Sequence, residues 1–294
     1  MASLIILLSL ALLFWKYHLL YTEQKTEQQL HSLVNTEDKS PLPLPPKNKA
    51  LILPILMYHH IGEPPKNASK VRKQLTVSVE NFKNQIQWLK KQGYNTIKLI
   101  DIYNFYLGKI ALPNKPIILT FDDGYDDAFV NAIPILDQNG FIGSFAIITT
   151  FPHAKIGDNF YASWEEIITA YKTGHEIVSH TQDHFDGKNK KYSNEFVKNN
   201  LASSIYDLND KLGFTTKVLI YPYGHYTPEY IKIAKEQGFV LGITVHEGYT
   251  INTDNFMEIP RLRVNGNLTQ ANFEKMLEKA IDTPSTSLPS LLKK

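Results

Sequence analysis

The sequence predicts an α/β fold in which helices surround a barrel of parallel strands. Apolar runs alternate with amphipathic runs from residue 51 to about residue 281. Several apolar runs are continuous, as expected of strands that are buried on both faces. Strands that alternate with helices form parallel βα units. Six or seven such units favour a closed barrel, and a doubly wound open sheet is the alternative.

The expected strands are short apolar segments, and they cover residues 52–58, 116–121, 143–148, 175–179, 217–221 and 239–244. The expected helices repeat apolar side chains at helical spacing. They cover residues 79–92, 126–139, 163–172, 194–212, 228–237 and 270–280. Five glycines stand just beyond helix ends, where a left-handed cap residue is favoured: Gly93, Gly140, Gly174, Gly213 and Gly238.

Composition limits the classes of function. The chain has 294 residues, of which 43% are hydrophobic, and this is enough for one large core. Its formal net charge is +2, so nothing global indicates a nucleic-acid partner. The chain has no cysteine, which excludes disulfides and thiolate zinc sites. Any metal ion must therefore be bound by His, Asp or Glu side chains.

The two ends of the chain differ from its middle. Residues 2–15 form an apolar run without charges, and residues 16–21 extend it close to the length that spans a membrane. We therefore expect residues 1–21 to be a membrane anchor, with a cleaved signal or a buried helix as alternatives. Residues 22–50, which end in a proline-rich stretch, and residues 283–294 are expected to be a disordered linker and tail. The folded domain is expected at residues 51–282.

Two polar clusters, each directly after an expected buried strand, carry the residues of a divalent-metal site. They are TFDDG at 120–124 and SHTQDH at 179–184. Alone, the first is more often a turn, and a single histidine is more often structural. Two histidines four apart on a helical turn face the same way, as in many zinc sites. His180 and His184 can thus bind a metal with Asp123, and Asp122 is left free to act as a base.

Further polar motifs fall at the C-terminal ends of expected strands, where barrel enzymes build their active sites. In YPYG at 221–224, Pro222 and Tyr223 form either a packed turn or a wall that binds an oxyanion. His246 is either a general acid or a solvated loop residue. His59, with its neighbour His60, is a weaker candidate for lining the site.

Two arginines near the C-terminus are candidate partners of the carboxylates. Arg261 and Arg263 lie in the segment IPRLRV at 259–264. They either pair with Asp122 or Asp126, which would fix the base, or form a surface ion pair.

Taken in this order, the motifs resemble those of the polysaccharide deacetylase family, the family 4 carbohydrate esterases with a NodB homology domain. The resemblance covers residues 51–281 and implies a distorted (β/α)7 barrel. It implies a zinc ion bound by Asp123, His180 and His184, with Asp122 as general base. It also implies that the backbone of Tyr223 helps to form an oxyanion hole.

The chain departs from the family pattern in places. Ile220 stands where many members carry an arginine, the fourth motif is not evident, and His246 lacks its usual setting. The segments LMYHHI at 56–61, FKNQIQWL at 82–89 and IPR at 259–261 resemble the subgroup that acts on poly-β-1,6-N-acetylglucosamine of biofilms. In that subgroup Arg261 is expected to replace the missing arginine.

The resemblance implies a metal-dependent hydrolase that removes N-acetyl groups from an extracellular polysaccharide containing N-acetylglucosamine. We expect a monomer that is anchored to a bacterial membrane and faces outward, or is secreted. Peptidoglycan, chitooligosaccharide and acetylated xylan are alternative substrates. A catalytically silent, membrane-tethered glycan-binding protein is the alternative outside the enzyme class.

Overall fold

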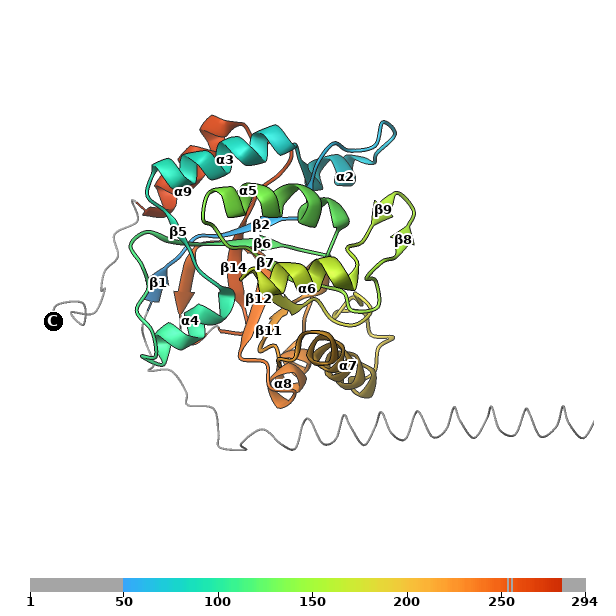
Figure 1. Ribbon diagram of the computed structural model, residues 1–294. Helices are drawn as coiled ribbons and strands as arrows, with labels where there is room; N and C mark the ends of the chain where they lie inside the picture. The colour runs from blue at the N-terminus through green and yellow to red at the C-terminus, as the bar shows by residue number, and fades with distance from the viewer. Residues whose placement is uncertain (1–49, 253, 255, 282–294) are drawn as a thin grey trace, which may run out of the picture. The chain divides into compact units, whose positions relative to one another are not determined.

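Seven parallel strands form a closed barrel within residues 50–252, 254 and 256–281, which the computed structural model describes (Figure 1). The ring closes because the first strand of the barrel pairs with both its neighbours in space. The barrel is therefore confirmed, and the open-sheet alternative is wrong. In spatial order the strands are β2 (Ile55–Tyr58), β14 (Ile259–Arg263), β12 (Leu241–Glu247), β11 (Val218–Ile220), β10 (Glu176–Ser179), β7 (Ser144–Ile147) and β6 (Pro116–Phe121).

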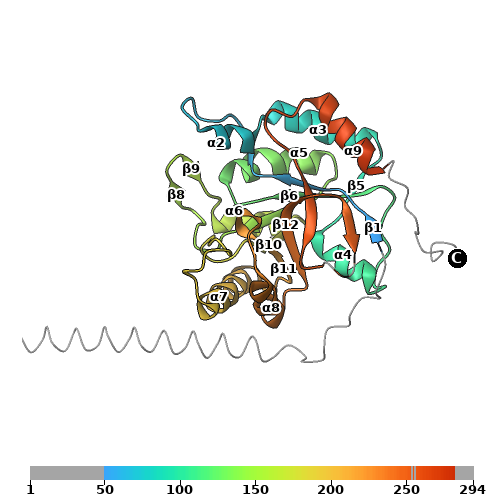
Figure 2. The same ribbon diagram turned by 180° about the vertical axis from the view of Figure 1, so that it is seen from behind.

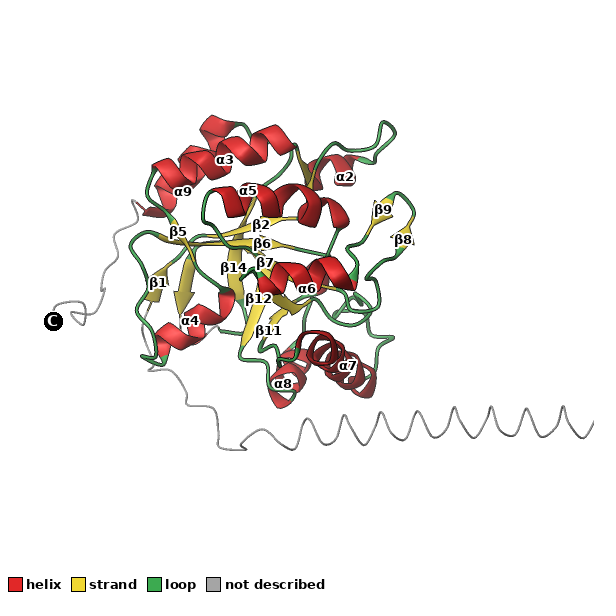
Figure 3. Ribbon diagram, in the orientation of Figure 1, coloured by secondary structure: helices red, strands yellow, loops and turns green. Residues whose placement is uncertain are grey.

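Helices lie around the strands of this barrel (Figure 3). The pairs α3 and α9, and α7 and α8, are in contact. The helices are α2 (Lys70–Leu75), α3 (Val79–Lys91), α4 (Leu99–Tyr106), α5 (Ile133–Gln138), α6 (Trp164–Lys172), α7 (Asn194–Leu212), α8 (Pro228–Glu236) and α9 (Gln270–Ile281). A π-helical turn, η1 (Ala128–Ala132), leads into α5, and a 3-10 turn, η2 (Pro222–Gly224), follows β11.

Further short strands lie outside the ring of seven. The hairpin of β8 (Lys155–Ile156) and β9 (Asn159–Phe160) lies on the same side as α2 in both views (Figure 2). The remaining pairs are β1 (Ala50–Ile52) with β13 (Thr250–Asn252), β3 (His60–Ile61) with β4 (Thr76–Val77), and β5 (Asn95–Thr96) with β6.

All the expected strands and helices are present; β6 and α7 have the expected bounds, and the others have shifted ends. The expected strand 52–58 is divided between β1 and β2, and the expected helix 126–139 between η1 and α5. The helices α2 and α4 and the strand β14 were not expected. Pro260 argues against a central strand because it cannot donate to a ladder. The structure accommodates it at a register shift between β12 and β14, where the regular pairing is interrupted.

Local sequence signals set the helix boundaries. Serine side chains accept a hydrogen bond from the first turn at Ser78, Ser163 and Ser193, the N-caps of α3, α6 and α7. All five glycines expected as caps have positive φ angles. At the end of α7, Gly213 has a φ of 73° and donates its N–H to the Asn209 carbonyl.

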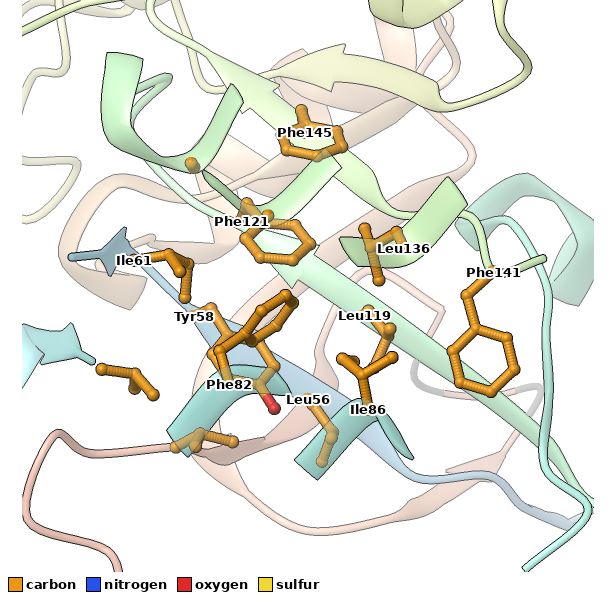
Figure 4. Close-up of a cluster of buried hydrophobic side chains, with 14 of the residues drawn as sticks. Leu56, Tyr58, Ile61, Phe82, Ile86, Leu119, Phe121, Leu136, Phe141 and Phe145 are labelled. Carbon is orange, nitrogen blue, oxygen red and sulfur yellow. The ribbon is translucent and has the colours of Figure 1, made fainter. Parts of the chain in front are cut away.

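Aromatic rings fill the space between the barrel and its helices. Phe121 stacks between Phe145, at 4.7 Å between ring centroids, and Tyr58, at 5.4 Å, and Phe82 meets it edge-on (Figure 4). All four side chains are buried. Because Tyr58 and Phe121 end the neighbouring strands β2 and β6, this stack stabilises the strand ends that precede the polar motifs.

The expected anchor at residues 1–21, the linker at 22–50 apart from Ala50, and the tail at 283–294 lie outside the described residues. Ala50 begins β1 and is not part of a linker. Within the described residues, no helix combines the length and the apolar character needed to cross a membrane.

We expect Phe145→Ala to lower the free energy of unfolding by about 3–5 kcal/mol, because it removes a fully buried ring and leaves a cavity. Urea denaturation followed by circular dichroism measures the change. The matched control is Phe160→Ala on the β8–β9 hairpin, where the ring is 53% exposed and the expected loss is under about 0.5 kcal/mol. Equal losses at the two positions would contradict this description of the core.

Candidate active site

The polar motifs lie at the C-terminal ends of barrel strands, as expected. Asp122 and Asp123 follow β6, His180 follows β10, and Pro222 follows β11. Since all seven strands are parallel, these ends share one face of the barrel.

The carboxylate of Asp123 lies between two imidazole rings. Its Oδ1 is 3.1 Å from His180 Nε2 and 3.2 Å from His184 Nε2. The three candidate ligand atoms lie within 4.8 Å of one another. Asp123 and His180 are buried, whereas the His184 side chain is 17% exposed and leaves one side accessible. Three protein ligands with an open side are typical of catalytic zinc sites.

A backbone contact fixes the orientation of His180. Its Nδ1 lies 2.7 Å from the carbonyl oxygen of Ile220. A carbonyl oxygen only accepts, so Nδ1 must carry the proton, and Nε2 is then directed to Asp123. Ile220, whose side chain departs from the family pattern, thus supports the site through its backbone.

The expectation that the two histidines share a helical turn is wrong. Residues 180–184 form an irregular loop, in which Thr181 has a φ of 69° and His184 a φ of 54°. Left-handed backbone costs about 1–3 kcal/mol at each such residue. The side chains of His180 and His184 converge because hydrogen bonds hold this loop. Their spacing of four residues does not reflect a helix.

Arg261 is the partner of Asp122. Its guanidinium donates from Nη1 to Oδ1 and from Nη2 to Oδ2, each at 2.7 Å. It also donates to Thr120 Oγ1 and to the Thr244 carbonyl. Arg261 is fully buried, so the alternative of a surface ion pair is wrong. A bidentate pair of this kind fixes the carboxylate in both position and orientation.

The two adjacent carboxylates remain ionised for different reasons. Burial opposes the charge of Asp122, but the charge and hydrogen bonds of Arg261 outweigh it and lower the pKa of Asp122. Burial also opposes the charge of Asp123, whose pKa is held well below its usual range by hydrogen bonds from His180 and His184. Burial favours a neutral His180, yet the contact with Asp123 raises the pKa of its imidazole.

The neighbouring histidines His59 and His60 differ in their surroundings. His59 is half-buried, and burial lowers the pKa of its imidazole, although the nearby charges of Asp122 and Asp123 oppose the shift. His60 is buried and bonds through Nδ1 to Asp127 at 2.8 Å. His59 therefore lies within electrostatic reach of the site, and His60 belongs to a supporting network.

Two other candidates lie on the exposed side of the site. Tyr223 is 56% exposed, has a φ of 58°, and places its ring 4.6 Å from the ring of His184. Pro222 before it is buried in the turn η2. His246 is exposed near the end of β12, and its ring is 6.0 Å from that of Tyr226. Among the described residues, His246 makes no hydrogen bond or ion pair with the Asp122–Asp123 pair.

The sequence interpretation missed several supporting residues. Tyr125 stacks on His60 at 3.6 Å between ring centroids, and burial together with the charge of Asp123 raises the pKa of its phenol. Thr120 contacts Arg261 from the strand before Asp122. Their positions inside and just after the TFDDG motif are the only sequence signal that could have identified them.

The residues present fit a divalent metal ion. Two imidazole nitrogens and one carboxylate oxygen form a donor set that suits zinc. Because Nδ1–H of His180 is engaged by the Ile220 carbonyl, Nε2 is the ring nitrogen placed to bind a metal ion. The carboxylate of Asp122 points to Arg261 and is not part of the ligand cluster.

Comparisons with known proteins agree with this geometry. Residues 109–242 match the sequence profile of the family described as Polysaccharide deacetylase. A poly-beta-1,6-N-acetyl-D-glucosamine N-deacetylase from Staphylococcus aureus is 28% identical over 256 residues, which cover 80% of this chain and 85% of that protein.

Solved structures share the fold. The Streptococcus pyogenes deacetylase PplD in complex with acetate superposes with a TM-score of 0.69 at 25% identity, covering 78% of this chain and 99% of PplD. IcaB from Ammonifex degensii superposes with a TM-score of 0.65 at 24% identity. The match covers 78% of this chain and 96% of IcaB.

The profile match spans the strands that carry both carboxylates, both histidines and the YPYG turn. The profile match therefore includes the candidate metal-binding residues, whereas His59, His246 and Arg261 lie outside it. This chain therefore contains a polysaccharide deacetylase domain, matched over residues 109–242.

Proposed function

We propose that this chain hydrolyses N-acetyl groups of a polysaccharide that contains N-acetylglucosamine, with zinc as its cofactor. The observation that carries the proposal is the different setting of two adjacent carboxylates. Asp123 lies between two imidazoles, and Asp122 is bound by Arg261 instead. A protein that only binds glycans would not need an ionised base beside a metal site, so this arrangement favours an enzyme.

Asp122 is proposed to act as the general base. A divalent ion held by Asp123, His180 and His184 would supply Lewis acidity, which makes water acidic enough to lose a proton near neutral pH. Asp122 is ionised because Arg261 lowers its pKa, and each of its oxygens keeps a further lone pair to accept that proton. Addition of water to the acetamide carbonyl and cleavage of the C–N bond then give acetate and a free amine.

The remaining rim residues are assigned to the oxyanion and to the leaving group. The backbone N–H of Tyr223, in the turn fixed by Pro222, is proposed to stabilise the oxyanion that forms on the carbonyl. His246 is proposed to protonate the leaving amine, and its exposed position on β12 leaves it free to approach a bound polymer. His59 is proposed to line the sugar-binding side.

We propose poly-β-1,6-N-acetylglucosamine as the substrate. The Staphylococcus aureus relative named for this polymer, and the segments LMYHHI and IPR, support the choice. The apolar segment at residues 1–21 supports a location at the outer face of a bacterial membrane, with the chain acting as a monomer.

Acetate release from defined glycans tests the function. We expect release from oligomers of β-1,6-N-acetylglucosamine, loss of release after chelation, and recovery when Zn²⁺ is added back. Peptidoglycan fragments, chitooligosaccharides and acetylated xylan serve as comparison substrates. Faster release from one of these would replace the proposed substrate. Bound zinc without acetate release from any glycan would identify a binding protein instead.

We expect Asp122→Asn to lower the rate of acetate release by about 10²–10⁴-fold, because an amide cannot accept the proton from water. Zinc content by mass spectrometry should remain at one ion per chain, since Asp122 is outside the ligand cluster. The matched control is Asp126→Asn, four residues further along, which should keep nearly full activity. Full activity in Asp122→Asn with zinc bound would remove Asp122 from the mechanism.

We expect Arg261→Lys to shift the pH dependence of kcat/KM. In the wild type, Arg261 lowers the pKa of Asp122 from its ordinary value, so Asp122 stays ionised across neutral pH. Lysine cannot form the bidentate pair, and burial then raises the pKa of Asp122, so that activity is lost at a higher pH as the solution is acidified. The expected shift of the acidic limb is about one pH unit. Arg263→Lys, on the same strand, is the control and should leave the profile unchanged.

A further inference from the structure

A polar stripe on helix α7 contacts the loop that carries the histidine ligands. Asn200, Ser204 and Asp207 follow at helical spacing, among buried apolar residues of the same helix such as Leu201 and Leu208. Asn200 and Ser204 are themselves buried. Polar groups at core positions need partners, and all three find theirs in the loop or in the segment beside it.

We propose that Asn200 is a positioning residue of the metal site, which holds the turn between His180 and His184. Its Oδ1 accepts a hydrogen bond from the backbone N–H of Gln182 at 2.9 Å. Its Nδ2 donates to Asp183 Oδ2, also at 2.9 Å. Gln182 and Asp183 stand between the two histidines, so a single amide group binds the segment that joins them. The inference rests on the metal-dependent function proposed above.

The loop needs external support because its backbone is strained. Thr181, a β-branched residue, has a left-handed φ of 69°. Within the loop, Thr181 donates its N–H to Ser179 Oγ, and Thr181 Oγ1 accepts the N–H of His184. On the side of β7, the N–H groups of residues 149 and 150 donate to the carbonyls of Thr181 and Gln182. Asn200 supplies the opposing support from α7.

The two histidines depend on this support to different degrees. His180 directly follows β10. Its backbone N–H donates to the Ile147 carbonyl, and its ring Nδ1–H donates to the Ile220 carbonyl. Within the described residues, the ring of His184 forms its only ion pair or hydrogen bond with Asp123. The direction of the His184 ring is therefore set by the loop, and through the loop by Asn200.

The test compares zinc affinity and stability in matched variants. Asn200→Ala removes both hydrogen bonds, and we expect zinc to bind about 10–100-fold more weakly in chelator competition, as for other residues that orient metal ligands. Asn199→Ala changes the neighbouring exposed residue of the same helix and should leave the affinity within about twofold of the wild type. Activity of Asn200→Ala should recover as the Zn²⁺ concentration is raised.

A paired exchange tests the hydrogen bonds themselves. In the double variant Asn200→Asp with Asp183→Asn, the new carboxylate accepts from Gln182 and from the new amide, and the net charge is unchanged. We expect zinc affinity within about threefold of the wild type. If Asn200→Ala does not fold, Asn200→Ser replaces it, because its hydroxyl is better tolerated in a buried polar site but cannot reach both partners.

The outcomes separate this inference from its alternatives. A purely structural Asn200 would lower the melting temperature of the metal-free alanine variant and leave its zinc affinity unchanged, and that result would overturn the proposal. An exchange variant that binds zinc as weakly as Asn200→Ala would also overturn it. If the wild type bound no zinc, both the proposed function and this inference would fail. If only the prediction for the Asn200 variants failed, the proposed function would stand.

Discussion

Two adjacent buried carboxylates can both remain ionised only if each has its own positively polarised partner, and the site depends on this constraint. Asp122 has Arg261, and Asp123 has two imidazoles. If one partner served both residues, a shared proton would neutralise one of them, as in other carboxylate pairs. Because the partners differ, one carboxylate lies in the candidate metal site and the other is left for the base role proposed for it.

The barrel supplies those partners from distant parts of the sequence. Arg261 connects its own strand β14 to the neighbouring β12, through the carbonyl of Thr244, and across β2 to the end of β6, through Thr120 and Asp122. A fully buried ion pair is costly to desolvate, and an apolar pair of similar volume would often be at least as stable. The presence of the pair at the carboxyl end of the barrel is therefore better explained by the need to keep Asp122 ionised and oriented than by stability.

The sequence predicted the features that depend on local patterns. The short, mainly apolar stretches before the two motifs identified β6 and β10, and the motifs themselves identified Asp123 and His180 as neighbours in space. It did not predict β14, because Pro260 is tolerated only through a register shift that is set by the neighbouring strand. It also could not choose the partner of Arg261, since that pairing depends on barrel closure. The loop at 180–184 was misread as helical because a spacing of four residues is shared by helices and by other turns.

The ligands of the metal site are held with unequal firmness. Asp123 lies two residues beyond the end of β6, and His180 is held by carbonyls of β7 and β11, so the barrel strands set most of their geometry. His184 is held by a loop whose strained backbone is braced against α7 through Asn200. Contacts far from the substrate can therefore adjust metal affinity without changing Asp122, whose orientation depends on Arg261. Under the proposed roles, metal binding and base strength depend on different partners, Asn200 through the loop and Arg261 through β14.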